Sequence, residues 1–427
     1  MVKEVGFFDK GNITLTISHR SLFIVFLLVA IPIIPPAIAS SIIFITFMIL
    51  AFPLKNEKMR IYFEIWPLIA LVFIGAIAGL FLFFESGSIY FYFRDIFYFL
   101  MPVLSISVGY YFAKSSTKKN EVIRIIVLGA FISSILNYAE LLFGFNFFTN
   151  DFMEVRYKYQ LNSGMALIGF SILYFSGASK FFLFGKKTRL ALLIFFLVLI
   201  IVSVSRTNLG ALFIIIMLPI VLPRISAKSQ LFVLAPIILV VIFAGTLLSV
   251  AIPESTATNF TEKVLNSGNE VVVQEYEGAV NINQYWRSFE AFLGLQEYLD
   301  AGYFGLLFGQ GFGSYASASH IFEGKFQYIP IFHNGFITIL LKTGIVGILL
   351  FFMFLKRVVG KPLDPIGMPE VRFHSLLSIG MMWVLAINTY AIHGLYTPKI
   401  NILFLFVVGF IFQKKQATRD NPQKINS

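Results

Sequence analysis

The most constraining feature of this sequence is a series of long apolar segments that continues along nearly the whole chain. Most of them are about 20 residues long, which is the length of helix that crosses the hydrocarbon core of a bilayer. We therefore expect an all-α polytopic membrane protein with about twelve transmembrane helices, forming a single integral membrane domain over residues 1–427. The predicted spans cover residues 18–34, 36–54, 61–84, 89–113, 122–145, 163–183, 189–204, 207–222, 231–252, 332–355, 373–392 and 399–413.

The composition agrees with a lipid environment. Hydrophobic residues make up 58% of the chain and charged residues only 13%, whereas soluble domains contain about 25% charged residues. The absence of cysteine excludes disulfides, thiolate metal sites and a cysteine nucleophile. The five histidines are scattered and contain no His-x-x-x-His pair, so we predict neither a metal centre nor another cofactor.

The basic residues follow the topology of a membrane protein rather than that of a nucleic-acid-binding protein. The net charge is +11, and Lys and Arg concentrate in alternate short loops, for example at 55–60, 114–119, 186–189, 356–361 and 414–415. Because cytoplasmic loops carry the excess of Lys and Arg, this pattern places both termini in the cytoplasm. We expect a lipid bilayer as the surrounding medium and no nucleic-acid partner.

One polar segment, residues 253–331, is much longer than an ordinary loop and lies on the outer face according to the same topology. Within it, residues 284–299 have apolar side chains at three- and four-residue spacing, which predicts a helix that caps the bundle or lies on the membrane. A shorter outer loop covers residues 146–162.

Several cations break the positive-inside pattern, because Arg94, Arg156, Arg206, Arg287 and Lys325 all fall on the outer face or at its membrane boundary. A cation there is costly without a partner. Guanidinium groups bind phosphate oxygens in pairs, so this group of cations indicates an anionic ligand such as a phosphate.

Each of these cations also has a simpler interpretation. Arg206 is an interfacial side chain that extends toward water, and Arg287 pairs with Glu290 three residues later on its own helix. Arg156 is a solvated loop residue, and Arg94 forms a local ion pair with Asp95. The sequence alone leaves these interpretations open.

His333 stands where the large loop re-enters the membrane, with Asn334 beside it. A neutral imidazole at that boundary can accept a proton from a hydroxyl, although a lone histidine is ordinarily structural. The preceding run Gly309-Gln310-Gly311-Phe312-Gly313 is expected to form a tight turn rather than a nucleotide loop. Glu64 and Glu140 fall near span ends, so no acid is predicted at mid-bilayer, which disfavours a proton-coupled transporter.

Taken together, Ser205-Arg206 between paired spans, Arg287 in the large loop, the Gly-Gln-Gly-Phe-Gly turn and the stretch His333–Gly347 resemble the O-antigen polymerase and ligase superfamily (Wzy-type polymerases and related ligases). The resemblance covers about the second half of the chain. It implies a GT-C-like membrane fold with about twelve helices and one large periplasmic loop that contains short helices.

The resemblance also implies an activity. It suggests an inverting, metal-independent glycosyltransferase at the periplasmic face of a bacterial inner membrane, whose donor is a glycan on undecaprenyl diphosphate. Arg206 and Arg287 would bind the diphosphate, and His333 would act as general base on the acceptor hydroxyl. Candidate substrate-binding residues are Arg156, Asn334, Tyr285 and Lys325.

The acceptor separates the two branches of the superfamily. The His-Asn-Gly-Phe setting favours a polymerase, which accepts a lipid-linked repeat unit and can work with a chain-length regulator protein. The alternatives are a ligase that transfers glycan to lipid A core and, from a different class, a lipid-linked oligosaccharide flippase or other transporter.

Overall fold

The computed structural model describes residues 19–51, 60–86, 89–115, 120–144, 163–203, 205–222, 286–317, 328–360, 368–391, 396 and 400–420. This part of the chain is helical apart from turns and one antiparallel pair of two-residue strands, β1 (Ala316–Ser317) and β2 (Tyr328–Ile329). The helices are α1 (His19–Ala30), α2 (Pro36–Ala51), α3 (Arg60–Ser86), α4 (Ile89–Ser115), α5 (Glu121–Gly144), α7 (Gly164–Ala178), α8 (Lys186–Val202), α9 (Arg206–Val221), α13 (Trp286–Leu299), α14 (Gly302–Phe308), α15 (Gly335–Val359), α16 (Pro369–Ala391) and α17 (Ile400–Asp420).

The apolar segments of the sequence coincide with these helices, except for 231–252, which lies outside the described residues. Four helices within the described ranges are long and apolar enough to cross a membrane, and three more are apolar but shorter. The four contain Ile61–Phe81, Ile89–Ser115, Gly335–Val359 and Pro369–Ala391. The protein therefore has the all-α architecture expected of a membrane protein, with fewer full-length spans among the described helices than the twelve predicted.

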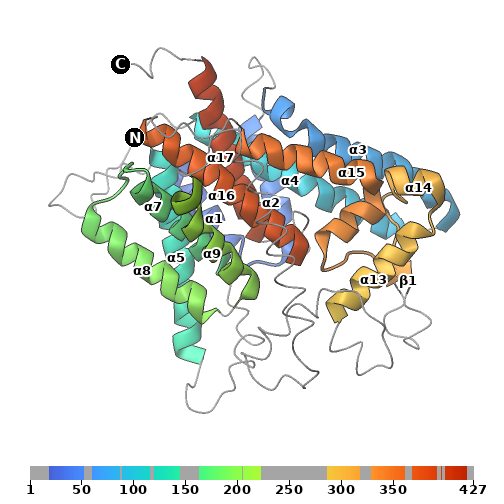
Figure 1. Ribbon diagram of the computed structural model, residues 1–427, viewed down its shortest axis with the longest axis horizontal. Coiled ribbons are helices and arrows are strands. Elements are labelled where there is room, and N and C mark those ends of the chain that lie inside the picture. The colour runs from blue at the N-terminus through green and yellow to red at the C-terminus, as the bar shows by residue number, and fades with distance from the viewer. Residues whose placement is uncertain are drawn as a thin grey trace.

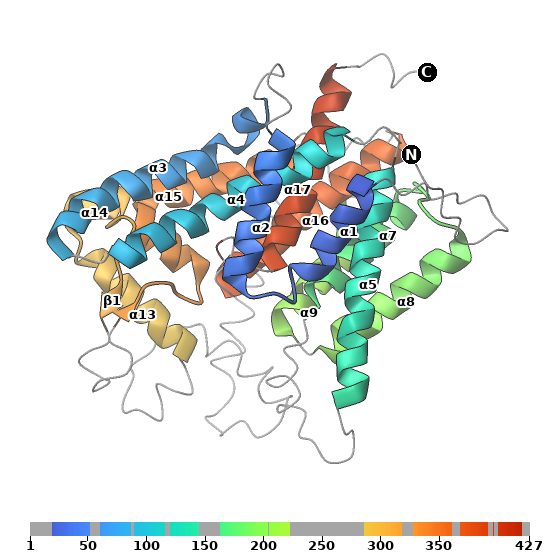
Figure 2. The ribbon, with the colours of Figure 1, turned by 180° about the vertical axis from the view of Figure 1, so that it is seen from behind.

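The helices form two groups on either side of a central pair (Figures 1 and 2). Helices α3, α4 and α15 run alongside one another in one group, and α5, α7, α8 and α9 form the other. Helices α16 and α17 lie between them, while α13, α14 and β1 pack at the far end of the α3–α15 group. The helix predicted at 284–299 is thus present as α13, and it lies at the end of the bundle.

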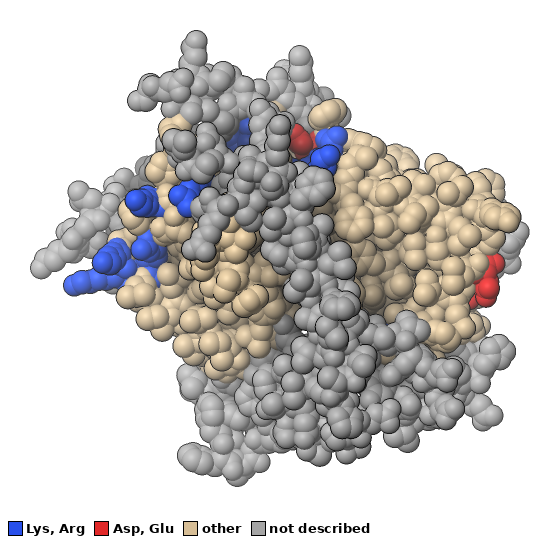
Figure 3. All heavy atoms as spheres, viewed as in Figure 1, with Lys and Arg blue, Asp and Glu red and all other residues tan. Residues whose placement is uncertain are grey.

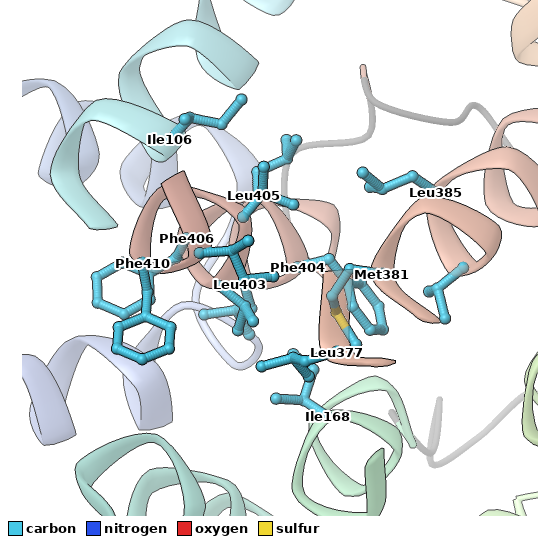
Figure 4. Packing of buried hydrophobic residues seen from close by; sticks show 14 of the residues in the cluster. Ile106, Ile168, Leu377, Met381, Leu385, Leu403, Phe404, Leu405, Phe406 and Phe410 are labelled. Atoms are coloured by element: carbon cyan, nitrogen blue, oxygen red, sulfur yellow. The ribbon is translucent and has the colours of Figure 1, made fainter. Parts of the chain in front are cut away.

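Helix α17 is buried on all sides over residues 401–412, as expected for a helix whose surface is apolar all round. Its leucines and phenylalanines pack against Ile106 of α4, Ile168 of α7 and three side chains of α16 (Figure 4). Gly109 and Gly409 allow the backbones of α4 and α17 to touch, because a Cβ at either position would meet the facing backbone. The last predicted span, 399–413, is therefore the centre of the bundle and extends to Asp420.

Charged side chains are confined to parts of the surface. Lys and Arg lie along the upper and left sides of the described surface in the space-filling view, acidic residues lie at its upper side and right edge, and a broad area between them carries no charged side chain (Figure 3). The end of α15 meets the start of α3, since Arg357 donates to the carbonyl of Phe63 at 2.5 Å and lies 3.8 Å from Glu64.

Candidate active site

The centre of the candidate site is a histidine–carboxylate pair that joins α13 to the start of α15. Nδ1 of His333 lies 2.6 Å from Oε2 of Glu290, and the backbone N–H of His333 donates to the same oxygen at 3.0 Å. The Glu290 side chain is only 6% exposed, whereas that of His333 is 35% exposed. The carboxylate is therefore enclosed by protein while the imidazole still reaches solvent.

This geometry determines what the imidazole can do. A neutral histidine has one N–H donor and one acceptor nitrogen. Because the Glu290 carboxylate can only accept, the proton belongs on Nδ1 and the lone pair on Nε2. A buried carboxylate in this position holds the ring in one tautomer and stabilises the imidazolium that forms when Nε2 takes a proton.

Local packing fixes the segment that carries His333. Phe332 is fully buried in a small core with Tyr298 and Leu341, and its N–H donates to the hydroxyl of Thr338 at 3.2 Å. Asn334 then caps α15, since its side-chain oxygen accepts from the N–H groups of the second and third helical positions, 336 and 337. Asn334 thus has a structural role at the helix start, directly beside the histidine.

Helices α13 and α15 approach closely at a single small residue. A Cβ on Gly294 would lie 2.6 Å from the Ile337 side chain and 2.9 Å from the ring of Phe332. Tyr298 extends the contact to α14, because its hydroxyl donates to the carbonyl of Leu306 at 2.6 Å. Burial raises the pKa of this phenol, which keeps the hydroxyl protonated as a donor.

Arg287 lies on α13 one turn before Glu290 and is half-buried. The pairing of Arg287 with Glu290 stays a prediction, while Oε2 of that carboxylate is bonded to His333 through both the backbone and the ring. The structure thus brings the helix of Arg287 to the candidate base and assigns Glu290 a role that the sequence did not indicate.

Arg206 begins α9, directly after the N-cap residue Ser205. The turn is held by a buried polar cluster: Ser203 donates to Ser163 at 2.7 Å, and the Asn208 side-chain amide donates to the same hydroxyl at 2.5 Å. The cluster ties together the adjoining ends of α7, α8 and α9. The Arg206 side chain lies outside the described residues, as do Arg156, Tyr285 and Lys325.

A second charged cluster, which the sequence did not predict, lies inside the helix bundle. Lys342 of α15 is fully buried, and its Nζ lies 2.6 Å from Oδ2 of the buried Asp95 in α4. Asp95 also pairs with Arg94 at 2.8 Å, which confirms the local ion pair. Asp95 is the seventh residue of α4, which agrees with the expectation that carboxylates lie toward span ends, and a cation from another helix compensates its charge.

The Gly-Gln-Gly-Phe-Gly segment completes this cluster. Gly309, Gly311 and Gly313 all have positive φ, so the predicted tight turn is present. The N–H of Gly313 donates to Asp95 at 2.9 Å, and Lys342 donates to the carbonyl of Ser314. Phe312 inserts against Gly75 and Gly79 of α3. The sequence did contain a signal for the Lys342–Asp95 pair, because each of two apolar helices carries one of two opposite charges that need a partner in a membrane.

Two further observations concern other kinds of site. Within the described ranges, no three His, Asp or Glu side chains lie close enough together to bind a metal ion. Comparison of the chain with protein-family models and with curated proteins finds no match.

Proposed function

We propose that this protein is a membrane-embedded inverting glycosyltransferase of the O-antigen polymerase type, which joins undecaprenyl-diphosphate-linked repeat units at the periplasmic face of a bacterial inner membrane. The observation that carries the proposal is the hydrogen bond between Nδ1 of His333 and the buried Glu290 carboxylate. It gives a half-exposed imidazole the tautomer required of a general base.

In the proposed reaction, Nε2 of His333 takes the proton of the acceptor hydroxyl as that oxygen attacks the anomeric carbon of the donor sugar. The new carbon–oxygen bond forms on the face opposite the bond to phosphate, which breaks with its electrons on the diphosphate. The Glu290 carboxylate stabilises the imidazolium. Arg287 and Arg206 would stabilise the charge on the leaving diphosphate through paired donors.

The position of these groups in the membrane supports the proposal. His333 lies just before the start of α15, and Lys356 and Arg357 lie in the last turn of the same helix. Under the positive-inside rule the basic end is cytoplasmic, so the His333 end faces the periplasm. Lipid-linked repeat units would reach it there from the outer leaflet.

The decisive experiment is reconstitution of the purified protein in vesicles with lipid-linked repeat units. We expect a ladder of glycans on one lipid carrier, unchanged in the presence of a chelator, and no ladder from His333→Ala. A normal ladder from that variant contradicts the assignment of the base. A ladder that requires added divalent cations contradicts the metal-independent reaction.

A polymerase and a ligase would share the donor site and differ in the acceptor. Transfer of preformed glycan to lipid A core, without ladder formation, would identify a ligase. In cells, loss of a polymerase leaves lipid A core that carries a single repeat unit. Loss of a ligase or a flippase leaves lipid A core that carries no repeat unit.

A transporter is the second candidate, and one observation favours it. Helix α15 is interrupted at Gly344 next to the buried Lys342–Asp95 pair, and secondary transporters use interrupted helices with buried ionisable groups. The pair lies about a quarter of the way along α4, whereas transport sites lie near the bilayer midplane. Movement of lipid-linked oligosaccharide across vesicle membranes without ladder formation would support this candidate.

A further inference from the structure

Helix α14 presents the most exposed aromatic surface among the described residues. Tyr303 is 91% exposed and Phe304 is 64% exposed, and Leu307 on the same side is half-exposed. Large apolar side chains clustered on one side of a short helix are unfavourable in water and mark a surface that contacts another phase or molecule. The opposite side of α14 packs against α15, so the helix is fixed in the fold with this surface outward.

Contacts with α3 fix the position of α14 along the length of the bundle. The segment that follows α14 packs against α3, because the N–H of Phe312 donates to the carbonyl of Gly75 at 2.8 Å and Gly79 contacts the Phe312 backbone. These glycines lie in the last third of the apolar stretch Ile61–Phe81. Helix α14 therefore lies beside the end of a helix long enough to cross the bilayer.

Exposed aromatic residues also lie on α3 and α4 near the position of α14 along the bundle. Phe81 near the end of α3 is 70% exposed, and Tyr90 and Phe93 at the start of α4 are similarly exposed. At the opposite end of α3, Phe63 and Trp66 are exposed beside the guanidinium of Arg357. Phe63 and Phe81 are separated by about 27 Å along the helix, close to the thickness of the hydrocarbon core.

We propose that α14 is an interfacial helix whose Tyr303, Phe304 and Leu307 side chains insert into the outer boundary of the lipid bilayer. The occupant of this surface is lipid, because the exposed aromatic side of α14 continues the aromatic band of α3 and α4, and such bands mark the two interfaces of membrane proteins. Asp300 precedes the helix and is exposed, which provides a polar residue on the water side.

Lipid contact at α14 would also affect the position of the candidate active site. Helix α14 is bonded to α13 through Tyr298 and Leu306, and α13 carries Glu290. Lipid contact through α14 would hold the His333–Glu290 pair at a constant depth near the lipid headgroups. The lipid contact itself does not depend on the proposed reaction.

The absence of cysteine allows a direct test. Tyr303→Cys and, as the matched control three residues earlier, Asp300→Cys are labelled with an environment-sensitive fluorophore. The labelled proteins are reconstituted in phosphatidylcholine–phosphatidylglycerol vesicles. Quenching is measured with aqueous iodide and with lipids that carry a nitroxide near the headgroup or deep in the acyl chain. Both native side chains are exposed, so neither substitution removes a core contact.

For the label at 303 we expect a blue-shifted emission, iodide quenching at least about fivefold weaker than at 300, and stronger quenching by the shallow nitroxide than by the deep one. Iodide quenching equal to that of the control would place α14 in water and overturn the proposal. Protection from both iodide and nitroxide lipids would also overturn it, because it would mean that protein covers the helix. A result at 303 that fits the proposal, together with absent polymerase activity, would contradict only the proposed function.

Discussion

At the scale of single residues, the candidate chemistry depends on the bond between Glu290 and His333, and this bond makes a prediction. Replacing Glu290 with glutamine keeps the size of the side chain but removes the negative charge that stabilises the imidazolium. We expect Glu290→Gln to lower the turnover number of the reconstituted enzyme by about a hundredfold or more, with a smaller change in the apparent affinity for donor. Steady-state kinetics of ladder formation measure both values.

The matched control for this variant is Glu297→Gln on the same helix. Glu297 lies two turns further along α13 and is half-exposed, so its charge is remote from His333. Equal losses of turnover in the two variants would mean that the effect comes from damage to α13 and would contradict the role of Glu290.

Arg206 gives a second prediction at this scale. A bidentate guanidinium and an ammonium carry the same charge, but only the guanidinium matches two phosphate oxygens at once. We expect Arg206→Lys to lower turnover by at least about tenfold, whereas an arginine that only extends toward interfacial water would tolerate lysine. Full activity of Arg206→Lys in the ladder assay would favour the interfacial interpretation.

These residues also show how far sequence reasoning could reach. His333 drew attention because the chain has only five histidines and the sequence assigns this one to a membrane boundary, and Arg287 because it departs from the predicted charge bias. Glu290 was considered only as the partner of Arg287, since spacing along a helix is visible in a sequence. Its hydrogen-bond partner His333 is 43 positions away, and only the tertiary packing of α13 against α15 brings the two together.

At the scale of elements, the N-terminal part of α15 is tied to α4 by the Lys342–Asp95 pair. Removing Asp95 leaves the fully buried Lys342 ammonium without its counter-charge, which costs about 3–5 kcal/mol, whereas removing both avoids that cost. Removing Lys342 alone leaves Asp95 paired with Arg94. We therefore expect Asp95→Asn to lower the thermal unfolding midpoint in detergent strongly and Lys342→Met to lower it less. The double variant should recover much of the loss. A double variant as unstable as the sum of the two singles would contradict the pairing.

The contact between α3 and the inserted glycine-rich turn gives another prediction. A Cβ at Gly79 would meet the backbone of Phe312, which cannot move aside as a flexible side chain could. We expect Gly79→Ala to destabilise the protein by about 1–3 kcal/mol. The control is Gly210→Ala in α9, where a Cβ meets nothing within 4 Å and the gain in helix propensity should slightly stabilise. Equal unfolding midpoints for the two variants would contradict the tight contact.

The sequence predicted helices correctly where a pattern of apolar residues defines them. It did not predict features that depend on contacts with other segments. The apolar segments and the amphipathic stretch of α13 were predictable because burial in lipid or against the bundle requires these patterns. The interruption of α15 at Gly344 was not foreseen. Gly344 has a φ of +64°, and its backbone contacts Leu307 and Gly309, so the break depends on a segment that inserts from outside the helix.

At the scale of the whole molecule, the basic clusters and the His333–Glu290 pair lie at different ends of the helices that carry them. The basic clusters that the sequence assigned to the cytoplasm lie at helix ends such as the start of α8 and the last turn of α15. The His333–Glu290 pair lies at the other end of α15. This separation was predictable because the charge bias of loops is a property of the sequence itself. The depth of α14 was not, because it depends on contacts with α3.

The orientation of the molecule is the last prediction, and it determines which compartment can supply the substrate. Lys187 at the start of α8 and Asp300 after α13 are both exposed, and the charge bias places them on opposite sides of the membrane. In bacterial spheroplasts that produce the cysteine-free protein with one cysteine introduced, a membrane-impermeant maleimide should label Asp300→Cys at once. Lys187→Cys should be labelled only after the membrane is permeabilised. The reverse pattern would place His333 and Glu290 on the cytoplasmic side, where polymerisation of outer-leaflet repeat units cannot occur.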